Sequence, residues 1–216
     1  AALTTISAYA QNNGGTAPVA ADYTAAGVTG IGGAGQPTVA QINAALADAD
    51  VIGTAADSTA EVQGIVDAYQ AILANADGTA NNATSPSAAD YTKLGVTGID
   101  TAAELGLLGD VIDGKTAADV ATPAQIQALA DAAAATVAYD GTNTAPTQAQ
   151  LEALGVTGLT ADNLAAVLAA IDAANSDGTP IASLADLQGV AATATGGAAA
   201  ALTTISAYAQ NNGGTA

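Results

Sequence analysis

The feature that most constrains this sequence is a duplication. The segment 1–17 (AALTTISAYAQNNGGTA) returns without a single change as 200–216. Seventeen matches in register do not arise by chance, so the offset of 199 residues between the copies indicates the period of a tandem repeat. Arrays of this kind build length and surface rather than one chemical site, because each repeat contacts mainly its neighbours. We therefore expect adjacent identical repeats to be the main partners of this chain.

A shorter motif recurs three times within the period. It reads ADYTAAGVTGI from Ala21, ADYTKLGVTGI from Ala89 and, in a more divergent form, AQLEALGVTGL from Ala149. We interpret the period as three small modules, preceded by the end of the previous repeat. These four segments cover 1–17, 18–84, 85–144 and 145–216.

Each module is predicted to contain three helices, so the predicted fold class is all-α. The first helix is short, covering about 19–26, 87–94 and 147–154, and each copy follows a proline and ends at a glycine. We expect these glycines in the left-handed C′ position, with the next valine supplying the apolar contact of a Schellman ending. The prolines and glycines are Pro18, Pro86, Pro146, Gly27, Gly95 and Gly155.

Capping-box spacings predict the starts of the remaining helices. Second helices are expected after Thr38, Thr101 and Thr160, and third helices after Ser58, Thr122 and Ser183. Glycines end the third helices at Gly78, Gly141 and Gly213 or Gly214. The Gly- and Pro-rich insertion 32–37 is predicted to be a loop. The pair Gly196-Gly197 lowers helix propensity by about 2 kcal/mol relative to alanine, so we expect a kink or break there.

The opening residues 1–11 match the closing half of the third helix of the last module. Leu3, Ile6 and Tyr9 recur at helical spacing, which places them on one face. Because their packing partners are assigned to the preceding repeat, we expect this segment to fray. Its interior copy, 200–210, is expected to be the protected one.

Composition excludes several classes of function. Twenty acidic residues against two lysines give a net charge of −18, which excludes phosphate recognition and so argues against nucleic-acid binding. No run reaches the roughly 18 unbroken apolar residues typical of a membrane span, so no membrane insertion is expected. The sequence begins with neither Met nor a signal peptide, as expected of an interior fragment. The core must rely on Ala, Val, Ile, Leu and six Tyr, because Phe, Trp, Met and Cys are absent.

The sequence also lacks the groups that most catalytic sites use. Without His or Cys, the usual triads and zinc sites are excluded. Two acidic pairs, Asp48 with Asp50 and Asp110 with Asp113, are expected at solvated helix ends, where no carboxyl pKa is raised for acid–base work. We therefore expect a chain that is not an enzyme and holds no cofactor.

Three Asp-Gly loops are weak candidates for calcium. Their acidic residues are Asp77, Asp140 and Asp177, and Asp and Asn oxygens are ligands for hard cations. None completes the spacing of an EF-hand, and Asp-Gly is an ordinary turn dipeptide, so plain turns are favoured over metal sites. One glycosylation acceptor, Asn82-Ala83-Thr84, is a weak match. The tyrosines recur at equivalent places, which favours packing over carbohydrate binding.

The phrases ADYTxxGVTGI, STAEVQGIVDAYQAIL and DGTxxAP resemble the Ala/Asp/Gly/Thr-rich helical repeats of very large bacterial surface proteins, adhesin-like exported chains. The resemblance implies an extracellular location at the bacterial cell surface. It also implies a stalk or spacer role, with adhesive domains elsewhere in the polypeptide. It carries over no functional residue.

Three functions remain open from the sequence. The first is a non-enzymatic structural spacer that projects adhesive domains, as in a biofilm. The second is a self-assembling filament or sheath subunit, which requires lateral self-association through exposed apolar patches. The third is a three-helix module that binds a host protein, which requires an exposed cluster of Tyr and Leu.

Overall fold

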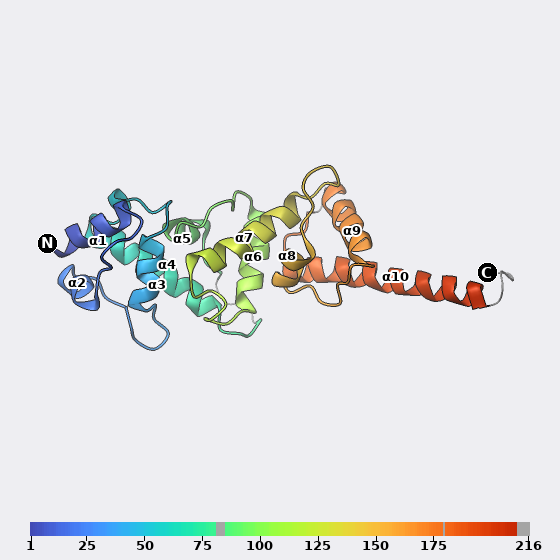
Figure 1. Ribbon diagram of the computed structural model, residues 1–216, viewed down its shortest axis with the longest axis horizontal. Coiled ribbons are helices and arrows are strands. Elements are labelled where there is room, and N and C mark those ends of the chain that lie inside the picture. The colour runs from blue at the N-terminus through green and yellow to red at the C-terminus, as the bar shows by residue number, and fades with distance from the viewer. Residues whose placement is uncertain (81–84, 179, 211–216) are drawn as a thin grey trace. The chain divides into compact units, whose positions relative to one another are not determined.

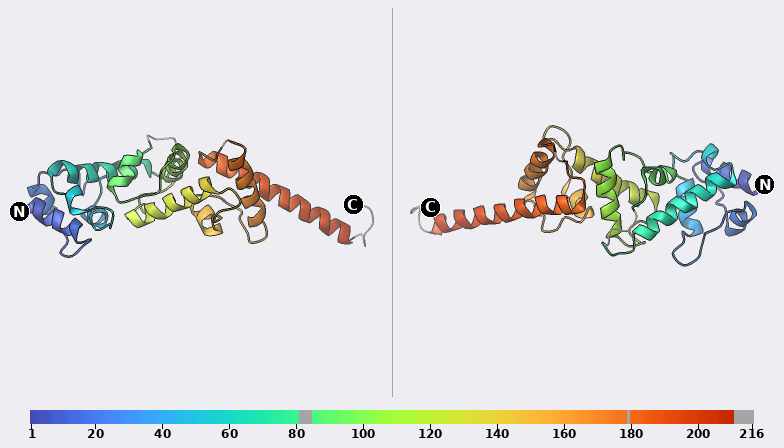
Figure 2. Two further views of the ribbon diagram at one scale, coloured as in Figure 1. Left: turned by 90° about the horizontal axis from the view of Figure 1, so that it is seen from above. Right: turned by 180° about the vertical axis from the view of Figure 1, so that it is seen from behind.

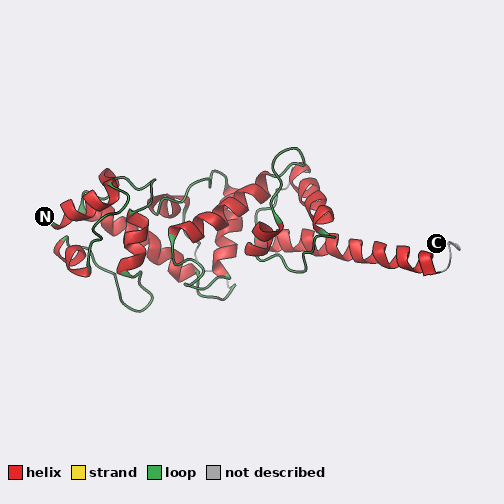
Figure 3. Ribbon diagram, in the orientation of Figure 1, coloured by secondary structure: helices red, strands yellow, loops and turns green. Residues whose placement is uncertain are grey.

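The protein is built from helices joined by turns and loops (Figures 1 and 3). The computed structural model describes residues 1–80, 85–178 and 180–210. Over these residues ten α-helices and one 3₁₀ helix follow one another, and the only β-type pairing is an isolated bridge between Asp77 and Thr116. The all-α prediction is confirmed.

After α1, the α-helices repeat an order of short, medium and long. The bounds are α1 Ala2–Gln11, α2 Ala20–Ala25, α3 Val39–Leu46, η1 Gly53–Ala55, α4 Thr59–Asn75, α5 Ala88–Lys93, α6 Ala102–Asp113, α7 Pro123–Ala138, α8 Gln148–Ala153, α9 Leu164–Ser176 and α10 Leu184–Gln210.

These helices form two compact units. Unit 1 comprises Ala1–Thr101 and Leu108–Asp131, and unit 2 comprises Ala102–Leu107 and Ala132–Ala216. The boundary between them falls inside α6 and α7. The three predicted modules therefore do not coincide with the two compact units, although the order of helix lengths recurs three times.

The short helices match their predicted bounds closely. Ser87 and Thr147 cap α5 and α8 with reciprocal capping boxes, and α2, α5 and α8 each end in the predicted Schellman turn. In α5, for example, the Val96 N–H donates to the Tyr91 carbonyl at 3.1 Å, and the Gly95 N–H donates to the Thr92 carbonyl at 3.0 Å. The terminating glycines have the expected positive φ, 78° at Gly27, 81° at Gly95 and 100° at Gly155. The preceding prolines, Pro18, Pro86 and Pro146, are buried.

Three tyrosines are the largest fully buried side chains in the core of unit 1. Tyr23, Tyr69 and Tyr91 are fully or almost fully buried, and this burial raises the pKa of each phenol. The Tyr23 hydroxyl donates to Asn43 Oδ1, and the Tyr69 hydroxyl donates to the Val120 carbonyl at 3.0 Å. The prediction that tyrosines serve packing is confirmed for these three.

Unit 2 is centred on the pairing of α9 with α10. Val167 and Ile171 of α9 and Leu187 and Ala191 of α10 are buried. Asn175, near the end of α9, donates from Nδ2 to the carbonyls of Thr136 and Tyr139, each at 2.9 Å. In α10 no residue after Ala191 is fully buried, and the helix runs on to its end at Gln210 (Figure 2). The loop at Thr160–Asn163 shares a hollow with Thr195, Leu202 and Ile205 of this part of the helix.

One predicted helix feature is wrong. The expected kink at Gly196-Gly197 is absent, because α10 continues through both glycines as one helix of 27 residues. Alanines at 198–201 have the highest helix propensity, and they carry the helix past the glycine pair. At Thr160 the reciprocal bonds of the predicted capping box are present, from the Thr160 N–H to Asn163 Oδ1 at 2.8 Å and from the Asn163 N–H to Thr160 Oγ1 at 3.4 Å, although α9 itself begins at Leu164. The predicted stops at Gly213 or Gly214, the acceptor at Asn82 and the module boundary at 84 fall outside the described residues.

Candidate interaction surface

The two copies of the duplicated segment fold alike but lie in different surroundings. Residues 2–11 form α1 in unit 1, and residues 200–210 form the end of α10 in unit 2. The same side-chain bond recurs in both: the Thr5 Oγ1 donates to the Ala1 carbonyl at 3.3 Å, and the Thr204 Oγ1 donates to the Ala200 carbonyl at 3.1 Å. The local structure of this segment therefore follows from its own sequence.

In unit 1 the apolar face of α1 is covered. The helix packs against η1, α2 and α3, and Ile6 and Ala10 have no exposed surface. This corrects the expectation that residues 1–11 would be an unpartnered end of the preceding repeat. The segment has its partners downstream, in residues that the sequence analysis assigned to a separate module.

Gly53 permits a close approach between η1 and α1. The Ser7 hydroxyl donates to the Gly53 carbonyl at 2.8 Å. A Cβ added at Gly53 would lie 2.9 Å from the Ser7 carbonyl oxygen and 2.9 Å from the Gln11 Cβ. Because the nearest oxygen belongs to the backbone of a helix, it cannot move aside as the end of a flexible side chain can. The contact between α1 and η1 therefore requires glycine at this position.

In unit 2 the same face is largely exposed, and part of it lines a hollow together with Asp162 and Asn163. Leu202 and Ile205 are each 64% exposed and Tyr208 is 47% exposed, although they correspond to Leu3, Ile6 and Tyr9. These three residues, Leu202, Ile205 and Tyr208, are called the α10 stripe below. They are among the few large hydrophobic side chains exposed in the described part of the chain, and an exposed apolar stripe on a helix is typical of an interaction surface.

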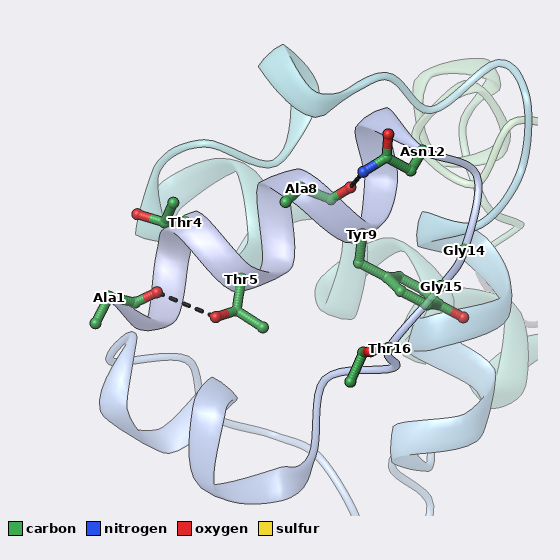
Figure 4. Close-up of a pocket in the computed structure, with 9 residues that line it drawn as sticks. All are labelled: Ala1, Thr4, Thr5, Ala8, Tyr9, Asn12, Gly14, Gly15 and Thr16. Atoms are coloured by element: carbon green, nitrogen blue, oxygen red, sulfur yellow. Dashed lines mark hydrogen bonds between the residues drawn. The ribbon is translucent and has the colours of Figure 1, made fainter.

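A hollow of about 700 Å³ lies beside α1 and is lined by threonines, alanines, Tyr9 and the turn after the helix (Figure 4). Its polar groups bond locally: the Asn12 Nδ2 donates to the Ala8 carbonyl at 2.7 Å, and Thr5 bonds the Ala1 carbonyl. No charged side chain lines it. Such a lining offers shape and methyl groups to a packing partner, and it lacks the converging charged or acid–base groups typical of a reaction site.

The acidic pairs are engaged in local turns or packed within unit 1. Asp48 Oδ1 accepts the Asp50 N–H at 3.1 Å, and the Asp48 carboxyl group also lies against Gly95. Asp113 is buried in α6, whereas its neighbour Asp110 is partly exposed. Neither predicted pair lines one of the larger hollows together; the hollow that Asp50 lines is shared with Glu61 and Lys93 and not with Asp48.

The three candidate calcium loops hold their acids in turns. Asp140 Oδ1 accepts three bonds, from the Thr142 N–H, the Thr142 hydroxyl and the Asn143 N–H, at 2.8 to 3.1 Å. These bonds, the one from the Thr142 N–H foremost, lower the Asp140 pKa. Asp77 accepts the Thr79 N–H at 2.8 Å, and Asp177 is the C-cap of α9. Within the described ranges, no three acidic residues gather closely enough to hold a metal ion.

One recurrent contact was not anticipated from the sequence. The Gln63 side chain bonds both the N–H and the carbonyl of Thr29, at 3.0 and 3.2 Å, and Gln127 does the same to Thr97, at 2.9 and 3.1 Å. Each glutamine thus fixes the loop after a short helix to a long helix. Gln188 stands at the equivalent position of α10, five residues after Ser183. A glutamine at this position in all three long helices is the sequence pattern from which the contact could have been predicted.

The sequence predicts no segment that could span a membrane, but α10 is long and apolar enough to be a candidate. By length and composition, with a mean hydropathy of 1.2, it is the one helix in the described part of the chain that is long and apolar enough to cross a membrane. Only 6% of its most apolar window is buried.

A search of protein-family descriptions, curated proteins and solved structures gave no match to this chain.

Proposed function

We propose that this chain is a non-enzymatic structural repeat, a stalk or spacer of a very large extracellular bacterial surface protein that projects adhesive domains. One observation carries the proposal. The same seventeen residues occur 199 positions apart. Residues 2–11 of one copy and 200–210 of the other are helical, and the apolar side chain at position 6 is buried whereas its copy at position 205 is exposed. A surface that is complete only beside another copy of the sequence is what a tandem array requires.

The helix order supports a finer proposal. Each 199-residue repeat would hold three three-helix modules, α2–α4, α5–α7 and α8–α10, because the lengths run 6, 8 and 17, then 6, 12 and 16, then 6, 13 and 27 residues. The glutamine contacts of Gln63 and Gln127 recur in the same pattern. The net charge of −18 keeps a long polymer of such repeats soluble and self-repelling.

The α10 stripe favours a second candidate, a self-assembling surface filament. In that case separate chains, rather than repeats of one chain, would cover the exposed face. The acidic surface opposes lateral association at low ionic strength, because like charges repel within a Debye length of about 10 Å at 0.1 M salt. For this reason the spacer is the preferred proposal.

The two functions are separated by solution scattering and light scattering on chains of one, two and three periods. For a spacer we expect monomers at micromolar concentration whose maximum dimension grows by a constant increment with each added period. A mass that rises with concentration in the one-period chain would overturn the spacer in favour of the filament. In the one-period chain Ile205→Asp is the matched control, since there no following repeat covers residue 205 and the substitution removes the apolar face of the filament contact.

A further inference from the structure

Ile6 and Ala10, which α1 buries, are the same side chains as Ile205 and Ala209, which α10 leaves exposed, and Leu3 and Tyr9 of α1 are half-buried. Ile6 has no exposed surface, whereas Ile205 is 64% exposed. Because the two segments share every residue from 1 to 17, the difference comes entirely from what surrounds them. The surroundings of α1 are known in detail, and they therefore specify what fits the α10 stripe.

The cover of α1 is one continuous piece of chain. It consists of α2, α3 and η1, which lie between residues 20 and 55. The Ser7 hydroxyl bond to the Gly53 carbonyl and the close approach of Gly53 to Gln11 fix the register of this cover. Ser206 and Gln210 repeat Ser7 and Gln11, so the end of α10 carries the same groups for the same contact.

α10 has two apolar parts with different cover. Leu187 and Ala191 are buried in unit 2, and from residue 200 onward every described residue is exposed. No charged residue follows Asp186 in α10, and the one charged residue that shares a hollow with Leu202 and Ile205 is Asp162, in the loop before α9. The helix is unbroken between the two parts.

We propose that residues 200–210 are the α1 of the next repeat in the same polypeptide, covered by that repeat's copies of α2, α3 and η1. The inference rests on the proposed tandem array and deepens it. Consecutive repeats then share one helix, which begins in the core of one repeat and ends in the core of the next. A lipid bilayer is the competing cover, but the identical α1 is covered by protein, and the stripe shares its helix with Thr203, Thr204 and Ser206.

The experiment uses single cysteines as probes, because the chain has none of its own. Ile205→Cys is placed in the chain of one period and, at the junction, in a chain of two periods. Its reaction with a soluble maleimide is followed at equal concentration. Ala207→Cys is the matched control, since Ala8, its counterpart in α1, is exposed. Ala209→Cys, the counterpart of the buried Ala10, is a second probe that removes no large side chain.

We expect the thiols of Ile205→Cys and Ala209→Cys to react in the one-period chain as freely as the thiol of Ala207→Cys. At the junction of the two-period chain we expect these two probes to react roughly 100-fold more slowly, while the control reacts freely in both chains.

Three other results would overturn the shared helix. Free reaction of both probes at the junction would overturn the shared helix directly. The spacer function would still stand if the maximum dimension measured by solution scattering grew by a constant increment with each added period. Protection in the one-period chain that appears only at high protein concentration would assign the cover to a separate chain. Protection that appears only with added neutral phospholipid vesicles would assign it to lipid.

Discussion

The opposite surroundings of the two copies predict opposite effects of one substitution. Ile6→Ala removes a side chain that has no exposed surface, and truncating a buried isoleucine to alanine costs about 2–5 kcal/mol through lost burial and the cavity left behind. Ile205→Ala removes a side chain that is 64% exposed, where a surface change stays within roughly 0.5 kcal/mol. The two sites have the same neighbours in sequence, so helix propensity cancels in the comparison.

The measurement is urea unfolding of each variant and the parent, followed by circular dichroism at 222 nm and by tyrosine fluorescence. We expect the midpoint of unit 1 to fall for Ile6→Ala by an amount equivalent to about 2 kcal/mol or more, and to stay with the parent for Ile205→Ala. Equal destabilisation by the two substitutions, or none at Ile6, would refute the packing assigned to α1. In a two-period chain, the junction copy of Ile205 should become as sensitive as Ile6.

Four further outcomes are expected. Gly95→Ala should lower the melting temperature of the protein more than Gly27→Ala does. Both residues have positive φ, but only at Gly95 would a Cβ also collide with the Asp48 carboxyl group. Equal melting temperatures of the two variants would contradict this prediction. Replacing Gly196 and Gly197 together by alanine should raise stability in α10 by about 1–2 kcal/mol, since both positions face open space, and a loss of helical signal would count against a continuous helix. The bonds that lower the Asp140 pKa stabilise the fold at pH values above the ordinary aspartate pKa near 4. This stabilisation is lost as the pH falls through the lowered pKa. Asp140→Asn should therefore make the melting temperature fall less steeply with pH between about pH 5 and 2. Calcium should raise the melting temperature modestly, with sodium at equal ionic strength giving much of the same gain, and unfolding by a chelator alone would reveal a specific site.

The features predicted correctly from the sequence are those that depend on a few neighbouring residues. Capping boxes at Ser58, Ser87 and Thr147 and the glycine at position 95 are local, and each was placed to within a residue or two. The features that were wrong or missed depend on packing. The cover of α1 includes η1, which lies some fifty residues away in the sequence. The close contact between α1 and η1 depends on Gly53, and nothing in the sequence distinguishes this glycine from the others.

The boundaries of the modules show the same limit. A division of the sequence where glycine and proline cluster separates α1 from residues 18–84, which contain its actual cover. Identity with residues 200–210 assigns that cover to the preceding repeat, whereas in the structure it comes from the chain that follows. The continuity of α10 escapes prediction for a related reason, because the cost of two glycines depends on the alanines that flank them.

The stretch of α10 between Ala191 and residue 200 has a mechanical consequence. Its eight residues, 192–199, belong to neither the buried part of unit 2 nor the duplicated segment, and they include both glycines. A helix rises about 1.5 Å per residue and an extended chain about 3.4 Å, so pulling this stretch straight lengthens it by about 15 Å while the buried parts at its two ends stay closed. Because none of its residues is fully buried, we expect it to yield at lower force than either core. A polymer of these repeats would therefore carry one extensible element per period, which absorbs sudden loads before any core opens.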